Sequence, residues 1–136
     1  MDAPSTNHPG EINAWVYKAE EDFRTATTMV RKRKEPAPDN VCFCAQHCIE
    51  KYLKAFLVLH RVHFPKIHDL LALLDFAVDL DADLEALRVD LNFLYPYAIE
   101  FRYPGENATI DESREAVRVM LRVRRTLRAK LNLADV

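Results

Sequence analysis

The most apolar stretch of the chain reads NVCFCAQHCIEKYLKAFLVLHR from residue 40 to residue 61. Its apolar side chains recur at helical spacing but cover more than one face of a helix; they are Val41, Ala45, Cys48, Ile49, Tyr52, Leu53, Phe56, Leu57 and Leu59. A helix that is apolar on several faces contacts several neighbours. The pattern therefore predicts the central helix of a bundle, with Asp39 or Asn40 as its N-cap.

Further helical stretches flank this central one on both sides. Apolar periodicity predicts helices over residues 11–32, 68–78, 83–101 and 111–131, with a kink at Pro96 and an N-cap at Asp111. No stretch alternates with the period of two that a half-buried strand shows. We therefore predict an all-α domain over residues 11–131, an antiparallel bundle of about five helices, with a flexible lead-in at residues 1–10 and a tail at residues 132–136.

The composition excludes several classes of function. The 136 residues carry a formal net charge of -2, which argues against a general nucleic-acid coat. Gly10 and Gly105 are the only glycines, so the glycine-rich phosphate loops of Walker and Rossmann proteins are absent. No apolar run is long enough to cross a bilayer, and residues 1–10 lack the apolar core of a signal peptide. Three clustered cysteines fit reduced thiols, so we expect a cytoplasmic protein.

Two short polar segments interrupt the helical pattern at prolines, and we call them the first and second corners. The first corner reads FPKIHDL at residues 64–70, and the second corner reads EFRYPG at residues 100–105. Cationic and aromatic groups at helix ends can contact phosphate or stack on a base. The alternative is that both corners only satisfy the backbone groups that are freed at these helix ends.

One cluster of potential zinc ligands lies within the central helix. Its members are Cys42, Cys44, His47 and Cys48. On a helix Cys44, His47 and Cys48 share a face and Cys42 points elsewhere, whereas a structural zinc site needs four convergent ligands. Cysteine is also often buried as a small apolar side chain. We therefore expect core packing here rather than metal binding.

A second cluster of potential metal ligands contains the adjacent pair His68 and Asp69, together with His60 and His63. A His-Asp pair is similar to that of metal-dependent phosphohydrolases. A hydrolytic metal centre draws its ligands from several elements, whereas these residues share one short segment. We therefore predict that His68 and Asp69 cap and start the third helix, and that the chain binds no metal and no cofactor.

Two basic features suggest a nucleic-acid interpretation. The run RKRK at residues 31–34 ends the first predicted helix, where cations also complement the helix dipole. The last helix carries arginines at steps of three and four, which form a ridge: Arg114, Arg118, Arg122, Arg125 and Arg128. The ridge would suit RNA, nucleotide phosphates or an acidic partner. For both features we favour the alternative, a solvated helix face, which is the usual role of charge clusters.

The chain resembles the HEPN domain family in a series of short motifs. They are AEEDF at residues 19–23, AQHCIEKYLKAFL at residues 45–57, KIHDL at residues 66–70 and FRYP at residues 101–104. The resemblance covers about residues 11–131. It implies an all-α bundle that commonly dimerises, with a cleft between the protomers. It also implies a nucleotide- or RNA-related role beside a minimal nucleotidyltransferase, in pairs that can act as toxin–antitoxin systems.

The resemblance also bears on ribonuclease activity. HEPN nucleases resemble one another in an arginine followed, after four to six residues, by a histidine, and both protomers contribute these groups across the dimer cleft without metal. No histidine follows Arg102, and Pro65 breaks the helix between Arg61 and His68, which have six residues between them. The chain is more similar to the HEPN subgroup with His-Asp-Leu and Arg-Tyr-Pro signatures.

These observations define the predicted site. Its nucleotide- or RNA-binding residues are Lys66, His68, Asp69, Arg102 and Tyr103. We expect Lys66 and Arg102 to hold phosphate and His68 to donate a hydrogen bond or a proton, so His68 and Arg102 are the catalytic candidates. The expected partners are a second copy of the chain, a nucleotidyltransferase, and nucleotide or RNA, but no membrane. The alternatives are a metal-independent endoribonuclease and a non-catalytic helical interaction module.

Overall fold

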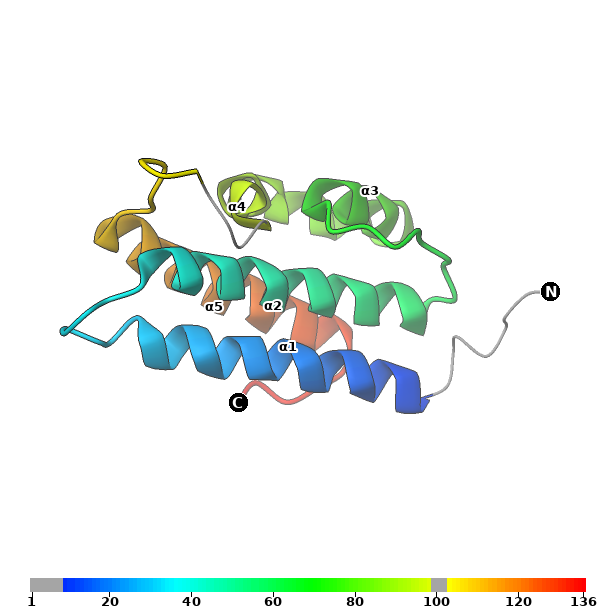
Figure 1. Ribbon diagram of the computed structural model, residues 1–136. Helices are drawn as coiled ribbons and strands as arrows, with labels where there is room; N and C mark the ends of the chain where they lie inside the picture. The colour runs from blue at the N-terminus through cyan, green and yellow to red at the C-terminus, as the bar shows by residue number, and fades with distance from the viewer. Residues whose placement is uncertain (1–8, 99–102) are drawn as a thin grey trace.

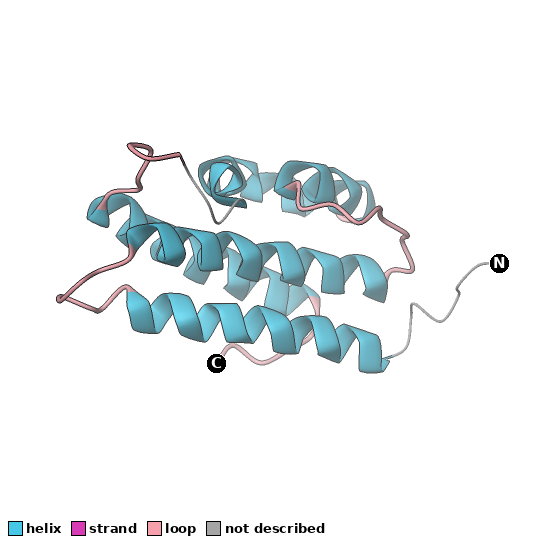
Figure 2. Ribbon diagram, in the orientation of Figure 1, coloured by secondary structure: helices cyan, strands magenta, loops and turns pink. Residues whose placement is uncertain are grey.

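The computed structural model of the chain describes residues 9–98 and 103–136. Figure 2 shows that the described residues form helices joined by loops, without strands, which confirms the predicted all-α bundle. In chain order the elements are α1 (Pro9–Met29), α2 (Pro38–Leu59), α3 (Leu70–Leu80), the 3-10 helix η2 (Ala82–Leu87), α4 (Arg88–Leu94), the 3-10 helix η3 (Tyr95–Ala98) and α5 (Ile110–Lys130). Among these described helices, none has the length and apolar character needed to cross a membrane.

The central helix of the bundle is α2, as predicted. It packs against α1, α5 and α3, and Figure 1 shows it between α1 and the layer that contains α3 and α4. Every residue from 52 to 58 is buried, whereas a helix with one buried face would expose some residues of each turn. The largest core side chains of α2 are Ile49, Tyr52, Leu53, Phe56 and Leu57.

The start of α2 differs from the prediction. The helix begins at Pro38, and its N-cap residue is Ala37, which has no side chain that could cap the helix. Proline suits the first helical position because its missing N–H would lack an intrahelical partner there anyway. Asp39 instead accepts a hydrogen bond from the backbone N–H of Ala108 at 2.7 Å. The predicted cap at Asp39 or Asn40 was therefore wrong, and Asp39 ties α2 to the segment before α5.

The start of α5 is set by a capping box. The Thr109 hydroxyl accepts a hydrogen bond from the backbone N–H of Glu112 at 3.0 Å, and the Glu112 carboxylate accepts one from the backbone N–H of Thr109 at 2.7 Å. Thr109 is therefore the N-cap, and the predicted cap at Asp111 was wrong. Asp111 lies in the first turn, where an acidic side chain favours the helix dipole.

The fourth predicted helix is divided into three short helical segments within the described residues. The chain passes from η2 to α4 and then to η3, where Pro96 lies. The buried side chains of η2 and α4 are Leu84, Leu87, Leu91 and Leu94, whose spacing of three and four suits both kinds of helix. Periodicity alone therefore predicts a helical face here but not the change in helix type.

Candidate functional site

The first corner places an exposed histidine beside a buried carboxylate. Asp69 is the N-cap of α3, because its carboxylate accepts hydrogen bonds from the backbone N–H groups of Leu71 and Ala72, both at 3.1 Å. The predicted capping role of Asp69 is confirmed, whereas His68 lies just outside the helix. Nδ1 of His68 donates to Oε2 of Glu50 in α2 at 2.7 Å.

Glu50 is the centre of a polar cluster on α2. The residue is 1% exposed, and its Oε2 also accepts a hydrogen bond from Nζ of Lys54 at 3.0 Å. Its Oε1 accepts one from Nε2 of Gln46 at 3.5 Å and lies 3.7 Å from Nδ1 of His47. We call these five residues, His68 included, the Glu50 cluster. α2 contributes four of them and the first corner contributes the fifth.

The charge of Glu50 is stabilised by its hydrogen-bond donors. Burial alone would raise the pKa of this carboxyl, because loss of water disfavours the anion. The hydrogen bonds from His68 and Lys54 outweigh burial and hold the pKa of Glu50 below its ordinary value of 4.5. The Lys54 ammonium also lies 5.2 Å from the centre of the Trp15 ring, a cation–π contact. The cluster is therefore a charged, internally paired group at neutral pH.

Glu50 fixes the orientation of the exposed His68 ring. The side chain of His68 is 69% exposed although its Nδ1 is bonded to Glu50. Because a carboxylate anion can only accept, Nδ1 carries a proton in both charge states of the ring. Nε2 of His68 therefore accepts a hydrogen bond when the ring is neutral and donates one when it is charged. A carboxylate fixes the tautomer and orientation of catalytic and ligand-binding histidines in the same way.

His47 is the second histidine of the cluster. Its Nε2 lies 3.0 Å from the backbone oxygen of Ala98, which can only accept, so Nε2 carries the proton and Nδ1 faces Glu50. His47, Glu50 and His68 each offer a ligand atom within 4.8 Å of the others, which is a spacing compatible with a metal ion. Lys54 already forms an ion pair with the same carboxylate, so a metal ion would have to compete with it.

The structure places part of the predicted site in the first corner. Lys66 and His68 are exposed there, and Asp69 uses its carboxylate to cap α3. Tyr103 of the second corner is 78% exposed. Arg102 lies outside the described residues, so its proximity to His68 stays a prediction.

Four members of the Glu50 cluster, all on α2, were not assigned to the site from the sequence. Gln46, Glu50 and Lys54 were regarded only as part of a family motif, and His47 also as a potential zinc ligand. A signal was present, since Glu50 and Lys54 are two opposite charges one turn apart in the most apolar helix. Charges on such a helix are buried only when they are paired. The face of α2 that meets the first corner could not be identified in this way.

The cysteines of α2 pack in or against the core. Cys42 and Cys48 are buried, and Cys44 is half-buried. Burial raises the pKa of the Cys48 thiol well above its ordinary value, which disfavours the thiolate that a zinc ion binds. Within the described ranges, no group of potential metal ligands includes a cysteine. These observations support the packing interpretation of this cluster.

Carboxylates neutralise most of the arginine ridge on α5. The ion pairs are Arg118–Glu115 at 2.8 Å, Arg122–Asp90 at 3.0 Å and Arg125–Asp135 at 3.1 Å. Arg128 is 8% exposed and donates a hydrogen bond to the Tyr52 hydroxyl at 2.8 Å. The prediction that Arg128 belongs to an exposed ridge was therefore wrong. Ion pairing favours the solvated-face interpretation for the central part of α5.

The lowered pKa values of Glu20 and Glu50 predict acid sensitivity. Each carboxylate stabilises the folded state fully above its ordinary pKa of 4.5, and this contribution is lost as the pH falls through the lower folded-state pKa. We expect the free energy of unfolding to decrease below about pH 4.5. Urea unfolding at a series of pH values measures this decrease. Glu20→Gln and Glu50→Gln should each make this decrease smaller. An unchanged pH dependence in both variants would show that these two carboxylates do not cause the acid sensitivity.

The fold and the cluster together define a class of protein, a small helical bundle with a carboxylate-oriented histidine at a helix break. A family model described as HEPN domain matches residues 12–130. The chain therefore belongs to the HEPN domain family, which confirms the resemblance found in its sequence motifs. Comparisons with curated proteins and with solved structures found no match.

Proposed function

We propose that this HEPN-domain protein is a nucleotide- or RNA-associated partner of a minimal nucleotidyltransferase, in a toxin–antitoxin-like pair. The observation that carries the proposal is the exposed His68 ring, which the buried Glu50 carboxylate holds through a 2.7 Å hydrogen bond. Membership of the HEPN family supports a role related to nucleotides or RNA. The first corner is the proposed contact surface for the phosphate groups of this ligand.

The chemistry of the first corner suits a phosphate. Nε2 of a charged His68 ring donates to a phosphate oxygen, and the exposed ammonium of Lys66 supplies a second cation two residues earlier. The Asp69 carboxylate would repel an anion, but it is directed to the backbone N–H groups of α3. In our proposal Arg102 adds a further cation and Tyr103 stacks on a base.

In our proposal the chain acts as a homodimer in the cytoplasm. A cleft between two copies would place both first corners near one ligand, as in the arrangement that the family commonly uses. The proposed nucleotidyltransferase contacts the same assembly. Co-expression with a nucleotidyltransferase encoded by an adjacent gene, followed by size-exclusion chromatography with light scattering, tests both the partner and the dimer.

The binding function is tested by replacing His68. We expect His68→Ala to weaken the binding of ATP or of a labelled single-stranded RNA by about tenfold, because one charge-assisted hydrogen bond to phosphate is lost. Isothermal titration calorimetry measures ATP binding, and fluorescence anisotropy measures RNA binding. His63→Ala is the matched control, since His63 is another exposed histidine of the same loop. Equal losses in the two variants, or no binding by the wild type, would contradict the proposal.

The same experiment separates the two alternative functions. A histidine that a carboxylate orients is also suited to proton transfer, which favours endoribonuclease activity as the second candidate. Cleavage of the labelled RNA in the presence of a metal chelator, with loss of cleavage in His68→Ala and not in His63→Ala, would support that activity. Neither binding nor cleavage by the folded wild type would favour the interaction module.

A further inference from the structure

A second candidate site lies at the opposite end of α2 from the first corner. A cavity of about 640 Å³ is formed between the connection from α1 to α2 and the first turns of α5. Figure 1 shows that this connection and the α2–α3 connection lie at opposite ends of α2. The volume is within the usual range for small-molecule sites, roughly 300–1,000 Å³. None of the residues that line the cavity is acidic.

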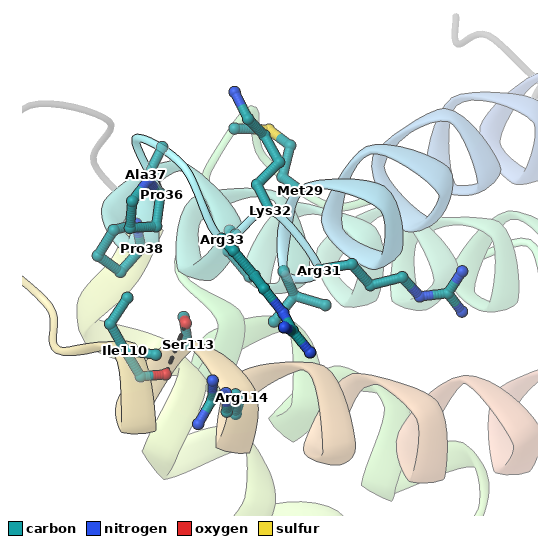
Figure 3. Close-up of a pocket in the computed structure, with 12 residues that line it drawn as sticks. Met29, Arg31, Lys32, Arg33, Pro36, Ala37, Pro38, Ile110, Ser113 and Arg114 are labelled. Atoms are coloured by element: carbon teal, nitrogen blue, oxygen red, sulfur yellow. Dashed lines mark hydrogen bonds between the residues drawn. The ribbon is translucent and has the colours of Figure 1, made fainter.

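Two arginines from separate elements line this cavity. Arg33 belongs to the basic run at residues 31–34, and Arg114 is the first arginine of the α5 ridge. Figure 3 shows the Arg33 side chain extending from the α1–α2 connection toward α5 and Arg114, whereas Arg31 and Lys32 extend in other directions. The fold therefore joins two basic features that are far apart in the sequence.

The positive charges of these two guanidinium groups are largely uncompensated by carboxylates. Within the described ranges, Arg33 forms no ion pair, and Arg114 approaches a carboxylate only at Asp111, with 3.9 Å between Nη1 and Oδ1. The Asp111 side chain is 96% exposed, so water screens this contact. Arg118, one turn after Arg114, forms a 2.8 Å pair with Glu115 instead. The positive charge at the cavity is therefore available to an anion.

The N-terminus of α2 borders the cavity. Ala37 and Pro38 line the cavity at the point where the helix begins, and no side chain caps this end. The carboxylate closest to it in sequence, that of Asp39, is bonded to the backbone N–H of Ala108. The backbone N–H groups at this end are therefore not capped by a side chain, while the charge of Asp39 in the first turn offsets part of the helix dipole.

Apolar side chains form most of the remaining wall of the cavity, beside Arg31, Lys32 and Ser113. The apolar side chains are those of Met29, Val30, Pro36, Ala37, Pro38, Val41 and Ile110. An inorganic ion would use only the cations, whereas a ligand with an apolar body would also bury its surface against this wall. The ion pairs of Arg118, Arg122 and Arg125 also interrupt the positive surface along α5. A discrete small ligand is therefore favoured over an extended nucleic acid.

We propose that this cavity binds a small organic phosphate. The phosphate group lies between the guanidinium groups of Arg33 and Arg114, whose planar donors match its oxygens. The apolar body of the ligand packs against Pro36, Pro38 and Ile110. This site is separate from the first corner and does not depend on the function proposed for His68.

Phenyl phosphate is a suitable probe, because it joins one phosphate group to one apolar ring. We expect calorimetry to show tighter binding of phenyl phosphate than of inorganic phosphate to the wild-type chain. Arg33→Ala and Arg114→Ala should each weaken phenyl phosphate binding by about tenfold, since each removes charge-assisted hydrogen bonds. Lys34→Ala and Arg118→Ala are matched controls, because each removes one exposed cation beside the site and should change the affinity by less than about twofold.

Each other outcome overturns a defined part of the proposal. Equal affinities for phenyl phosphate and inorganic phosphate would contradict the role of the apolar wall. Equal losses in all four variants would show a diffuse electrostatic surface rather than a discrete site. No binding of phenyl phosphate at millimolar concentration would overturn the proposal as a whole. The proposed function is read from the His68-dependent binding of ATP or RNA, and this proposal is read from the Arg33- and Arg114-dependent binding of phenyl phosphate, so failure of the one and failure of the other are distinguishable.

Discussion

Glu50→Ala should lower the free energy of unfolding by about 3 kcal/mol, because it removes one partner of a buried ion pair. The Lys54 side chain is 7% exposed and would remain as a buried ammonium without its carboxylate. Loss of a partner in a buried pair costs about 3–5 kcal/mol. We expect about 3 kcal/mol, the lower end of this range, because Lys54 keeps its contact with the Trp15 ring. Urea unfolding followed by far-UV circular dichroism measures the change.

Two comparison variants separate the structural role of Glu50 from its role in the site. Glu115→Ala removes a surface carboxylate that pairs with Arg118 and should cost less than about 1 kcal/mol. A Glu50→Met, Lys54→Met double variant should recover much of the stability, since apolar side chains of similar volume often replace a buried pair without loss. His68 still lacks its carboxylate in that variant, so phosphate binding at the first corner should stay weak. Equal stability of Glu50→Ala and Glu115→Ala would show that the buried pair contributes little.

The helical architecture could be predicted because it depends on local patterns. The unbroken burial of residues 52–58 confirms that the most apolar stretch is the central helix. Asp69 was identified correctly as a cap because its side chain and the apolar run after it are adjacent in sequence. Thr109 was overlooked although Thr109 and Glu112 have the spacing of a capping box. The correct cap was therefore predictable from this spacing, and the choice of Asp111 was an error of interpretation.

The candidate site was predictable only in part, because its charges meet through tertiary contacts. His68 was selected from its place in the first corner, but its partner Glu50 lies 18 positions earlier in the chain. Whether Glu50 or another polar residue of α2 faces the first corner depends on how α3 packs against α2. The presence of Arg33 and Arg114 at one cavity is of the same kind, since the α1–α2 connection and α5 meet only in the folded chain.

Disruption of a second, partly buried polar network should lower the free energy of unfolding by at least as much as Glu50→Ala does. The Glu20 carboxylate of α1 accepts two hydrogen bonds from Arg124 of α5, both at 2.8 Å, and one from the Tyr52 hydroxyl of α2. Arg124 is 4% exposed, and its guanidinium lies 3.8 Å from the centre of the Phe23 ring. Arg128 donates to the same Tyr52 hydroxyl at 2.8 Å. One carboxylate therefore joins three helices.

Glu20→Ala should lower the free energy of unfolding by about 3–5 kcal/mol, because the buried guanidinium of Arg124 would lose its bidentate partner. In the wild type, burial and the neighbouring Glu20 raise the pKa of Tyr52 to about 12, so its hydroxyl is protonated and donates to the Glu20 carboxylate. Urea unfolding measures the loss. Glu21→Ala is the matched control, since this adjacent carboxylate is 46% exposed, pairs with Lys18 only at 3.9 Å and should cost less than about 1 kcal/mol.

Tyr52→Phe tests how much the Tyr52 hydroxyl contributes to the stability of this network. This variant removes the hydroxyl but leaves the Glu20–Arg124 pair intact, so it should cost about 1–2 kcal/mol, between the other two variants. The order of stability should therefore be Glu21→Ala, then Tyr52→Phe, then Glu20→Ala. Suppose instead that Glu20→Ala is as stable as Tyr52→Phe or more stable. The Glu20–Arg124 pair then contributes no more free energy than the burial of its charges costs, and apolar packing on α2 alone holds α1 and α5 in place.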